Sequence, residues 1–218
     1  MSDDKKVYGF EGEKVDVAWD GRLCIHVQEC TRAKGKLFQS GREPWGQPDL
    51  GEPDYVAEVV RRCPTGALTY ERKDGGTGET APGTNTVVIS NNGPLYVEGD
   101  LAIDGAEDDM PGVRYRAALC RCGDSGNKPF CDNTHEQEGF RDRGALGDTG
   151  PGFESAGGPL EIKRLPDGPL IVSGNFTIVT AAGREGWRGT KAALCRCGKS
   201  ETKPFCDGSH APAGFKAD

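Results

Sequence analysis

Two short stretches of this chain concentrate residue types that bind metals. Residues 119–135 read LCRCGDSGNKPFCDNTH, and residues 194–210 read LCRCGKSETKPFCDGSH. A Cys-x-Cys pair presents two thiolates to one metal from adjacent backbone, and a cysteine and histidine four residues apart can reach a second metal from one turn of chain. Three sulfurs and one nitrogen are a full set for two bridged irons, and they would equally suit one tetrahedral zinc.

The two stretches belong to a longer repeat. Residues 93–103 (GPLYVEGDLAI) align with residues 168–178 (GPLIVSGNFTI), and AALCRCG occurs at both 117–123 and 192–198. The offset is 75 residues at each point, without a gap. A constant offset over this length indicates a duplicated module.

The full pattern of each stretch is C-x-C-x2-[ST]-x3-P-x-C-D-G-[STA]-H, and on it the chain resembles the CDGSH iron–sulfur family, which includes mitoNEET. The second copy matches this pattern throughout. The first copy has Asn133 and Thr134 in place of the glycine and the serine. Asparagine is among the few non-glycine residues that adopt left-handed backbone readily, so we expect the turn to be kept.

The resemblance implies one [2Fe-2S] cluster in each copy, held by three cysteines and one histidine. The Cys-x-Cys pair would bind one iron, and the third cysteine would bind the other together with the histidine. These ligands are Cys120, Cys122, Cys131 and His135 in the first copy, and Cys195, Cys197, Cys206 and His210 in the second. The alternatives are a zinc ion, or reduced thiols without any metal.

A histidine ligand changes the chemistry expected of such a cluster. Imidazole is neutral where thiolate is anionic, so the potential should exceed that of an all-cysteine cluster, as it does in Rieske centres. Protonation of the outer nitrogen would couple electron uptake to pH, and protonation of the metal-binding nitrogen would loosen the cluster. Neighbouring aspartates could donate order through hydrogen bonds or act as simple turn caps, and basic neighbours could offset cluster charge. These neighbours are Asp132, Asp207, Arg121, Arg196, Lys128 and Lys203.

The remaining three cysteines lie in the N-terminal third of the chain. Cys24 and Cys30 are spaced like the first and third ligands of the ferredoxin run C-x2-C-x2-C, but the middle position is Val27, which cannot bind iron. Cys63 is followed by proline, as is the last ligand of small ferredoxins. This unit resembles the divergent single-cluster ferredoxin family. The motifs that carry the resemblance are CIHVQEC at 24–30, PW at 44–45 and CPTGAL at 63–68.

Three cysteines can hold a [3Fe-4S] cluster, or a [4Fe-4S] cluster with a fourth ligand of another type. His26 is the only histidine nearby and is the candidate; the alternative is a loop histidine bonded to backbone. An empty, degenerate ferredoxin fold is the alternative to any cluster here. A strand at 15–19, a helix at 52–62 and a strand at 68–70 would fit half of a ferredoxin.

We expect an α+β protein: two small β-rich CDGSH modules and a small ferredoxin-like α+β domain. Family members with one motif pair by exchanging strands between two chains, so the resemblance implies an intramolecular pseudo-dimer here. The glycine-rich stretches at 72–84 and 143–158 indicate linkers. They separate three units, 1–71, 85–142 and 159–218.

Within each copy, period-two segments predict strands, and we expect a short helical turn after Pro129 or Pro204. The predicted strands lie near 87–89, 95–97 and 114–119 in the first copy, and near 160–165, 170–172 and 189–194 in the second.

The composition limits the class of protein. With 33 glycines and 35% hydrophobic residues, the chain is poorly supplied for one large core, which favours small units with metal staples. Nine cysteines cannot all pair. The first 20 residues lack a secretory h-region and no apolar run has transmembrane length, so we expect a cytoplasmic protein with reduced thiols. A net charge of −7 without a basic block argues against nucleic acid or membrane as main partner.

We expect the clusters themselves to be the function. The sequence has no Rossmann fingerprint, Walker loop or nucleophile–base pair, so we do not expect an enzyme. The first hypothesis is electron transfer with a redox partner protein. The second is cluster storage, transfer to an apo-acceptor protein, or redox and pH sensing; the third is a zinc-stabilised interaction module. The duplication is consistent with a monomer.

Overall fold

The N-terminal unit is built on a three-stranded antiparallel sheet. In the computed structural model, which describes residues 7–217, this sheet has the order β1-β2-β3. Its strands are β1 (Val7–Phe10), β2 (Val15–Asp20) and β3 (Leu68–Arg72). The predictions for β2 and β3 are confirmed, whereas β1 is an element that we did not predict. Residues 1–6 and 218, which the predicted units include, lie outside the described range.

The helix of this unit, α1 (Pro53–Arg61), confirms the helix predicted at 52–62. Pro53 stands in its first turn, where the missing N–H of proline costs nothing. Val56, Val59 and Val60 recur on one face and are fully buried. They form one core with Val15 and Val17 of β2, so the helix closes one face of the small sheet. A short 3-10 helix, η1 (Pro48–Leu50), precedes α1.

Both copies of the repeat contribute to one larger sheet. Its order is β6-β8-β9-β4-β5-β7, with β10 paired to β9. The strands are β4 (Thr86–Ile89), β5 (Leu95–Glu98), β6 (Asp100–Ile103), β7 (Arg116–Leu119), β8 (Pro159–Arg164), β9 (Leu170–Val179) and β10 (Glu185–Leu194). The strand predictions in both copies are confirmed. With only the short η2 (Pro111–Arg114) and α2 (Thr134–Gln137) besides, the chain is mostly β with few helices.

The two copies complete each other's sheet in a reciprocal way. β4 of the first copy pairs in parallel with β9 of the second, with Thr86 opposite Thr177. β8 of the second copy pairs in parallel with β6 of the first, with Glu161 opposite Ala102. The repeat offset of 75 residues converts one pair into the other. The same holds within the copies, where Leu95 faces Leu119 and Leu170 faces Leu194.

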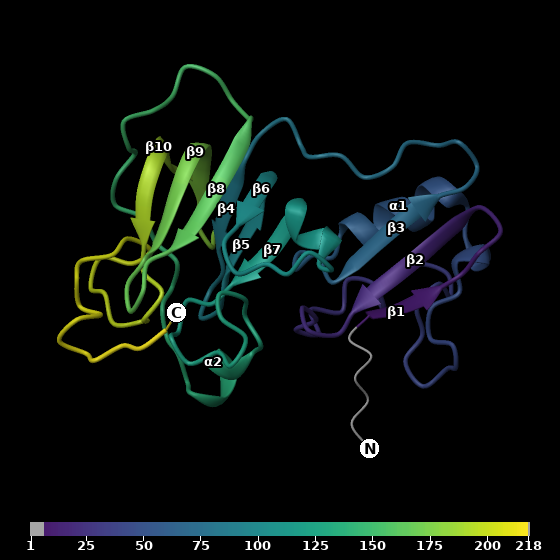
Figure 1. The fold of residues 1–218 in the computed structure, drawn as a ribbon, viewed down its shortest axis with the longest axis horizontal. Coiled ribbons are helices and arrows are strands. Elements are labelled where there is room, and N and C mark those ends of the chain that lie inside the picture. Colours follow the sequence, from purple (N-terminus) through teal and green to yellow (C-terminus); the bar gives the residue numbers. More distant parts are fainter. Residues whose placement is uncertain (1–6, 218) are drawn as a thin grey trace.

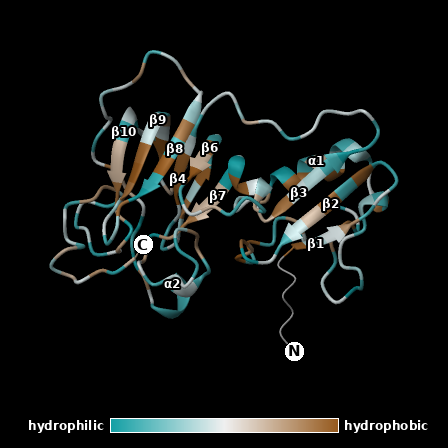
Figure 2. Ribbon diagram, in the orientation of Figure 1, coloured by the Kyte–Doolittle hydropathy of each residue, from teal (hydrophilic) through white to brown (hydrophobic). Residues whose placement is uncertain are grey.

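The core of the larger sheet holds the cysteine stretches in place. Figure 2 shows the strands largely brown and the connecting loops mostly teal. Each cysteine stretch begins where a strand from this core ends, β7 for Cys120 and β10 for Cys195. Both stretches lie at the same end of the sheet (Figure 1). The fully buried members of this core include Val87, Ile89, Leu95, Ala117, Leu119, Leu160, Ile162, Leu170, Val172, Phe176, Ile178 and Leu194.

Two expectations need correction or qualification. The chain directly after Pro129 and Pro204 forms turns, and the helical turn of the first copy begins five residues later, at α2. The glycine-rich stretches contain no helix or strand between residues 73 and 85 or between 143 and 158, all of which the structure describes. They are nevertheless anchored: the Glu79 carboxylate lies 2.8 Å from the Arg116 guanidinium, and the Gly152 amide donates to the Arg188 carbonyl.

Within residues 7–217, no helix combines the length and the apolar character needed to cross a bilayer.

Candidate metal centres

In the first copy, the four predicted ligands form two close donor pairs. The Sγ atoms of Cys120 and Cys122 are 3.7 Å apart. The Sγ atom of Cys131 lies 3.3 Å from Nδ1 of His135, which α2 carries. The Nδ1 atom therefore faces the thiol, and the outer nitrogen, Nε2, points away towards Gly93.

The second copy repeats this geometry. The Sγ atoms of Cys195 and Cys197 are 3.7 Å apart, and Cys206 Sγ lies 3.3 Å from His210 Nδ1. Within residues 7–217, no three histidine, cysteine, aspartate or glutamate side chains converge closely enough to hold one ion.

The donor pairs fit the coordination of iron by sulfur and nitrogen. Two thiolates about 2.3 Å from one tetrahedral metal are about 3.7 Å apart, and a thiolate and an imidazole nitrogen on one metal are about 3.5 Å apart. Each pair thus has the spacing of two ligands on one metal. The amides of Asp124, Asn133 and Lys199 donate to the neighbouring thiol sulfurs, as a thiolate-bound cluster requires.

Thiol acidity in the first copy favours binding of a cation by the Cys-x-Cys pair. The hydrogen bond from Cys122 lowers the pKa of Cys120 to about 7, and the pKa of Cys122 rises in turn. Burial raises the pKa of Cys131 to about 11. A metal ion would have to displace the proton from Cys131, so binding releases protons and depends on pH.

The aspartate beside each third cysteine braces the ligand loop. Asp132 accepts hydrogen bonds from the amides of Gly126 and Thr134, at 2.7 and 3.0 Å. Asp207 does the same with the amides of Glu201 and Ser209. Burial raises the pKa of Asp132, but the hydrogen bonds to its carboxylate outweigh that effect and lower it overall. These are the bonds of a turn cap that ties the two halves of the loop together.

Each copy also buries an arginine between its first two cysteines. Arg121 is 1% exposed, donates to the carbonyl oxygens of Gly93 and Ser90, and pairs with Asp142. Arg196 is equally buried and donates to the carbonyl oxygens of Gly168 and Leu165. Burial lowers the pKa of both arginines. A thiolate of the opposite copy opposes this shift, Cys195 for Arg121 and Cys120 for Arg196.

These arginines therefore place positive charge near both centres, as expected from the sequence. The lysines next to the prolines have a different role: the ammonium groups of Lys128 and Lys203 donate to the carbonyl oxygens of Ser125 and Ser200 within their own loops.

The two ligand loops touch each other through their glycines. Gly123 has a φ of +99°, and a Cβ placed on it would lie 2.6 Å from the Cys197 carbonyl oxygen. Gly198, with a φ of +75°, approaches the Cys122 carbonyl in the same way. The centres of the two copies are thus in backbone contact.

The two centres differ in how far protein covers them. Cys131 and His135 are 3% and 8% exposed, whereas Cys206 and His210 are only partly buried. The cover on the first centre comes from the N-terminal unit, because Ile25 packs in one buried cluster with Cys131. Burial there lowers the pKa of His135, which keeps the imidazole neutral.

The three N-terminal cysteines line one cavity of about 670 Å³. Burial raises the pKa of Cys30 to about 11, and the charges of Cys63 and Cys24 add to this shift, as expected of thiols that face one another. His26 is exposed, with its Nδ1 4.0 Å from Cys24 Sγ. Other residues lining the cavity include Trp19, Trp45, Arg42 and Pro64.

Sequence reasoning missed the residues that join the N-terminal unit to the first copy. Asn127 and Asn133 donate from their side chains to the carbonyl oxygens of Arg22 and Ile25, at 2.8 and 3.2 Å. One signal was present in the sequence: the departure from CDGSH to CDNTH, which we had interpreted only as a way to keep the turn.

Comparisons with known proteins bear on both kinds of centre. A family model described as an iron-binding zinc finger of the CDGSH type matches residues 92–136 and 167–211. A model described as a divergent 4Fe-4S mono-cluster matches residues 10–73. The Uncharacterized protein YjdI of Escherichia coli strain K12 is 42% identical over 64 residues, which cover 29% of this chain and 84% of that protein. The protein of the same name from strain O157:H7 gives the same values.

Proposed function

Because the chain belongs to the CDGSH-type iron-binding family, and carries an N-terminal domain of the divergent 4Fe-4S mono-cluster family, we propose that it transfers electrons on three iron–sulfur clusters. Such clusters supply one-electron chemistry at potentials that the surrounding protein sets.

The donor pairs of the two copies are the observation that carries the proposal. Each pair has the spacing of two ligands on one tetrahedral metal, and each copy offers two pairs. Two metals per copy, each with two protein ligands, is the requirement of a [2Fe-2S] cluster. The buried arginines near both centres would offset its negative charge.

We further propose that the two copies form an intramolecular pseudo-dimer about an approximate two-fold axis. The support is the reciprocal pairing of β4 with β9 and of β8 with β6, in registers that the repeat offset interconverts. A monomer is then sufficient to hold both centres.

For the N-terminal unit we propose a [4Fe-4S] or [3Fe-4S] cluster on Cys24, Cys30 and Cys63, with His26 as the candidate fourth ligand. The support is the shared cavity of the three thiols and the proximity of the imidazole to Cys24. A ferredoxin-like origin of this unit is consistent with its order of strands and helix.

The partner in this proposal is a redox protein, and neither a substrate turnover, nor nucleic acid, nor a membrane is part of it. A reducing, cytoplasmic setting suits nine cysteines that are all free of disulfides. Transfer of a whole cluster to an apo-acceptor, or redox and pH sensing, is the second candidate function, because the second histidine ligand, His210, is partly exposed. A zinc-stabilised interaction module is the third.

Purification without oxygen tests the proposal most directly. We expect a coloured protein whose visible absorption bleaches with dithionite. It should hold about seven or eight irons and a similar amount of sulfide per chain: four irons from the two CDGSH centres and the rest from the N-terminal unit. Cys63→Ser should remove only the N-terminal share. Iron near four in the native protein would refute the third cluster, and a colourless protein with zinc would refute the redox function.

His210→Cys should separate electron carriage from cluster transfer. Thiolate adds negative charge where imidazole was neutral, so we expect the potential of the second cluster to fall, on the order of 0.2 V. Potentiometric titration would measure this, with His135→Cys as the matched variant. A fall in potential alone favours electron carriage. An acid-stable cluster that can no longer pass to an apo-acceptor would favour cluster transfer instead.

A further inference from the structure

We propose that the N-terminal centre and the first CDGSH centre form a coupled pair joined through Ile25 and Asn133, and that the second CDGSH centre is the one that exchanges electrons with the partner protein. This inference rests on the proposed function, since it requires all three centres to hold clusters.

The contact between the first two centres runs from one ligand segment to the other. Ile25 follows Cys24 in the chain, is 5% exposed, and packs with Cys131. Its carbonyl oxygen accepts a hydrogen bond of 3.2 Å from the Asn133 side chain, two residues beyond Cys131. A peptide unit, one hydrogen bond and a short stretch of chain thus connect a ligand of one centre with a ligand of the other.

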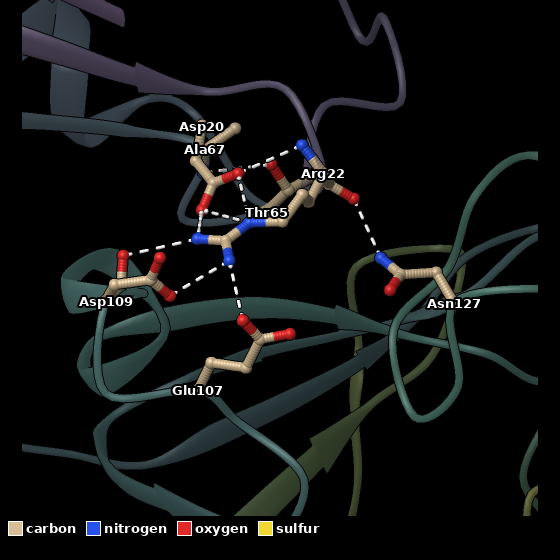
Figure 3. Close-up of polar contacts among 7 residues, drawn as sticks. All are labelled: Asp20, Arg22, Thr65, Ala67, Glu107, Asp109 and Asn127. Carbon is tan, nitrogen blue, oxygen red and sulfur yellow. Dashed lines mark hydrogen bonds and ion pairs between the residues drawn. The ribbon is translucent and has the colours of Figure 1, made fainter. Parts of the chain in front are cut away.

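Several buried polar contacts fix this contact in place. The Arg22 guanidinium binds Asp20 of its own unit and also Glu107 and Asp109 of the first copy, each at 2.9 Å, while Asn127 donates to the Arg22 carbonyl (Figure 3). Charge-assisted bonds of this kind are stronger than neutral ones. The N-terminal unit is therefore held on the first centre.

A second set of contacts joins the same two units near the third N-terminal cysteine. The Arg116 guanidinium donates to the carbonyl oxygens of Val60, Cys63 and Leu68, at 2.7 to 3.1 Å. The backbones of Gly66 and Gly112 touch so closely that neither position has room for a Cβ atom. Two of the three ligand segments of the N-terminal cavity therefore face the first copy.

The second copy has different residues at the matching positions. Thr202 replaces Asn127 and bonds within its own loop to Ser200, and Gly208 replaces Asn133. A Cβ on Gly208 would have open space around it. Cys206 and His210 remain partly exposed, so this centre is the more accessible of the two.

The arrangement gives an order for electron movement. One electron leaves the reduced N-terminal cluster, which is oxidised, and reduces the first CDGSH cluster; no bond forms or breaks. The touching loops at Gly123 and Gly198 then lead to the second cluster, which reduces a one-electron acceptor protein and is itself reoxidised. A one-electron donor protein recharges the N-terminal cluster.

Exchange of residues between the copies tests the contact. Asn127→Thr combined with Asn133→Gly gives the first copy the residues of the second, and Thr202→Asn with Gly208→Asn is the reciprocal control. We expect diethyl pyrocarbonate to modify His210 at least about tenfold faster than His135 in the native protein, measured on peptides by mass spectrometry. The first double variant should raise the His135 rate by about tenfold, because two hydrogen bonds are lost. The control should change neither rate.

Electron paramagnetic resonance tests the coupling itself. In the reduced holoprotein, a paramagnetic N-terminal cluster should speed the spin relaxation of the first CDGSH cluster, assigned through His135→Cys. Cys63→Ser should slow that relaxation by severalfold and leave the second cluster's signal unchanged. The double variant should weaken the coupling while iron and sulfide contents stay native.

Three results would overturn the inference. They are equal modification of His135 and His210 in the native protein, no response of His135 to the double variant, or identical relaxation of the first cluster with and without the N-terminal one. The modification rates do not depend on bound iron, whereas the iron and sulfide assay reports whether the clusters exist. Failure of the contact and failure of the proposed function are therefore distinguishable.

Discussion

Arg116→Ala is expected to lower the free energy of unfolding by about 3–5 kcal/mol and to release the N-terminal unit from the first copy. The Arg116 side chain is 4% exposed and reaches three carbonyl oxygens of the N-terminal unit. It also pairs with Glu79, which is itself buried. Removing the guanidinium would leave a buried carboxylate and three buried carbonyl oxygens without their donor, and that penalty dominates the loss.

Urea unfolding and limited proteolysis in the segment 73–85 would measure the two effects. Lys191 is the matched control, since it occupies the equivalent place in the second copy and is exposed. Lys191→Ala should change the free energy of unfolding by less than about 0.5 kcal/mol. Equal effects of the two substitutions, or an Arg116→Ala protein as resistant to protease as the native one, would show that Arg116 does not anchor the interface.

Gly198→Ala is expected to disrupt both CDGSH centres at once. The added Cβ would collide with the Cys122 carbonyl oxygen of the other copy, and the φ of +75° strains any residue with a side chain. Backbone atoms cannot move aside as a flexible side chain can, so the ligand loops must separate. We expect a loss of about 2–4 kcal/mol in stability and of iron from both copies.

Gly139→Ala separates the strain from the collision. Gly139 has a φ of +63° but open space around the position of a Cβ, so its substitution should cost only about 1–2 kcal/mol and retain both clusters. Iron content and the two reduction potentials of the variants would be compared. If Gly198→Ala lost iron only from the second copy, or behaved like Gly139→Ala, the backbone contact between the centres would have no functional weight.

The local elements of the fold could be read from the sequence because each depends on neighbours in the chain. The helix α1 follows from Pro53 and from valines at helical spacing, and β4, β5 and β8 follow from alternation over a few residues. The donor pairs follow from the repeated spacing of cysteine and histidine.

The contacts between units could not be read in this way, because they depend on surfaces far apart in sequence. Nothing in the alternation of β4 says that it pairs with β9 rather than within its own copy. Asn133 fits the turn equally well with or without the Ile25 carbonyl beside it. Arg116 looks like any basic residue at the start of a strand, and only the folded chain brings three carbonyl oxygens of another unit around its guanidinium.

The reciprocal pairing of β4 with β9 and of β6 with β8 has a consequence for how this protein can evolve. In an assembly of two identical chains, every substitution appears twice, so a residue that suits one face is imposed on the other. Joining the copies in one chain removes that constraint while the exchanged strands keep the halves inseparable. Asparagine at 133 and glycine at 208 are two outcomes of that freedom: one face has become a permanent internal junction, and its counterpart has stayed open for transient encounters.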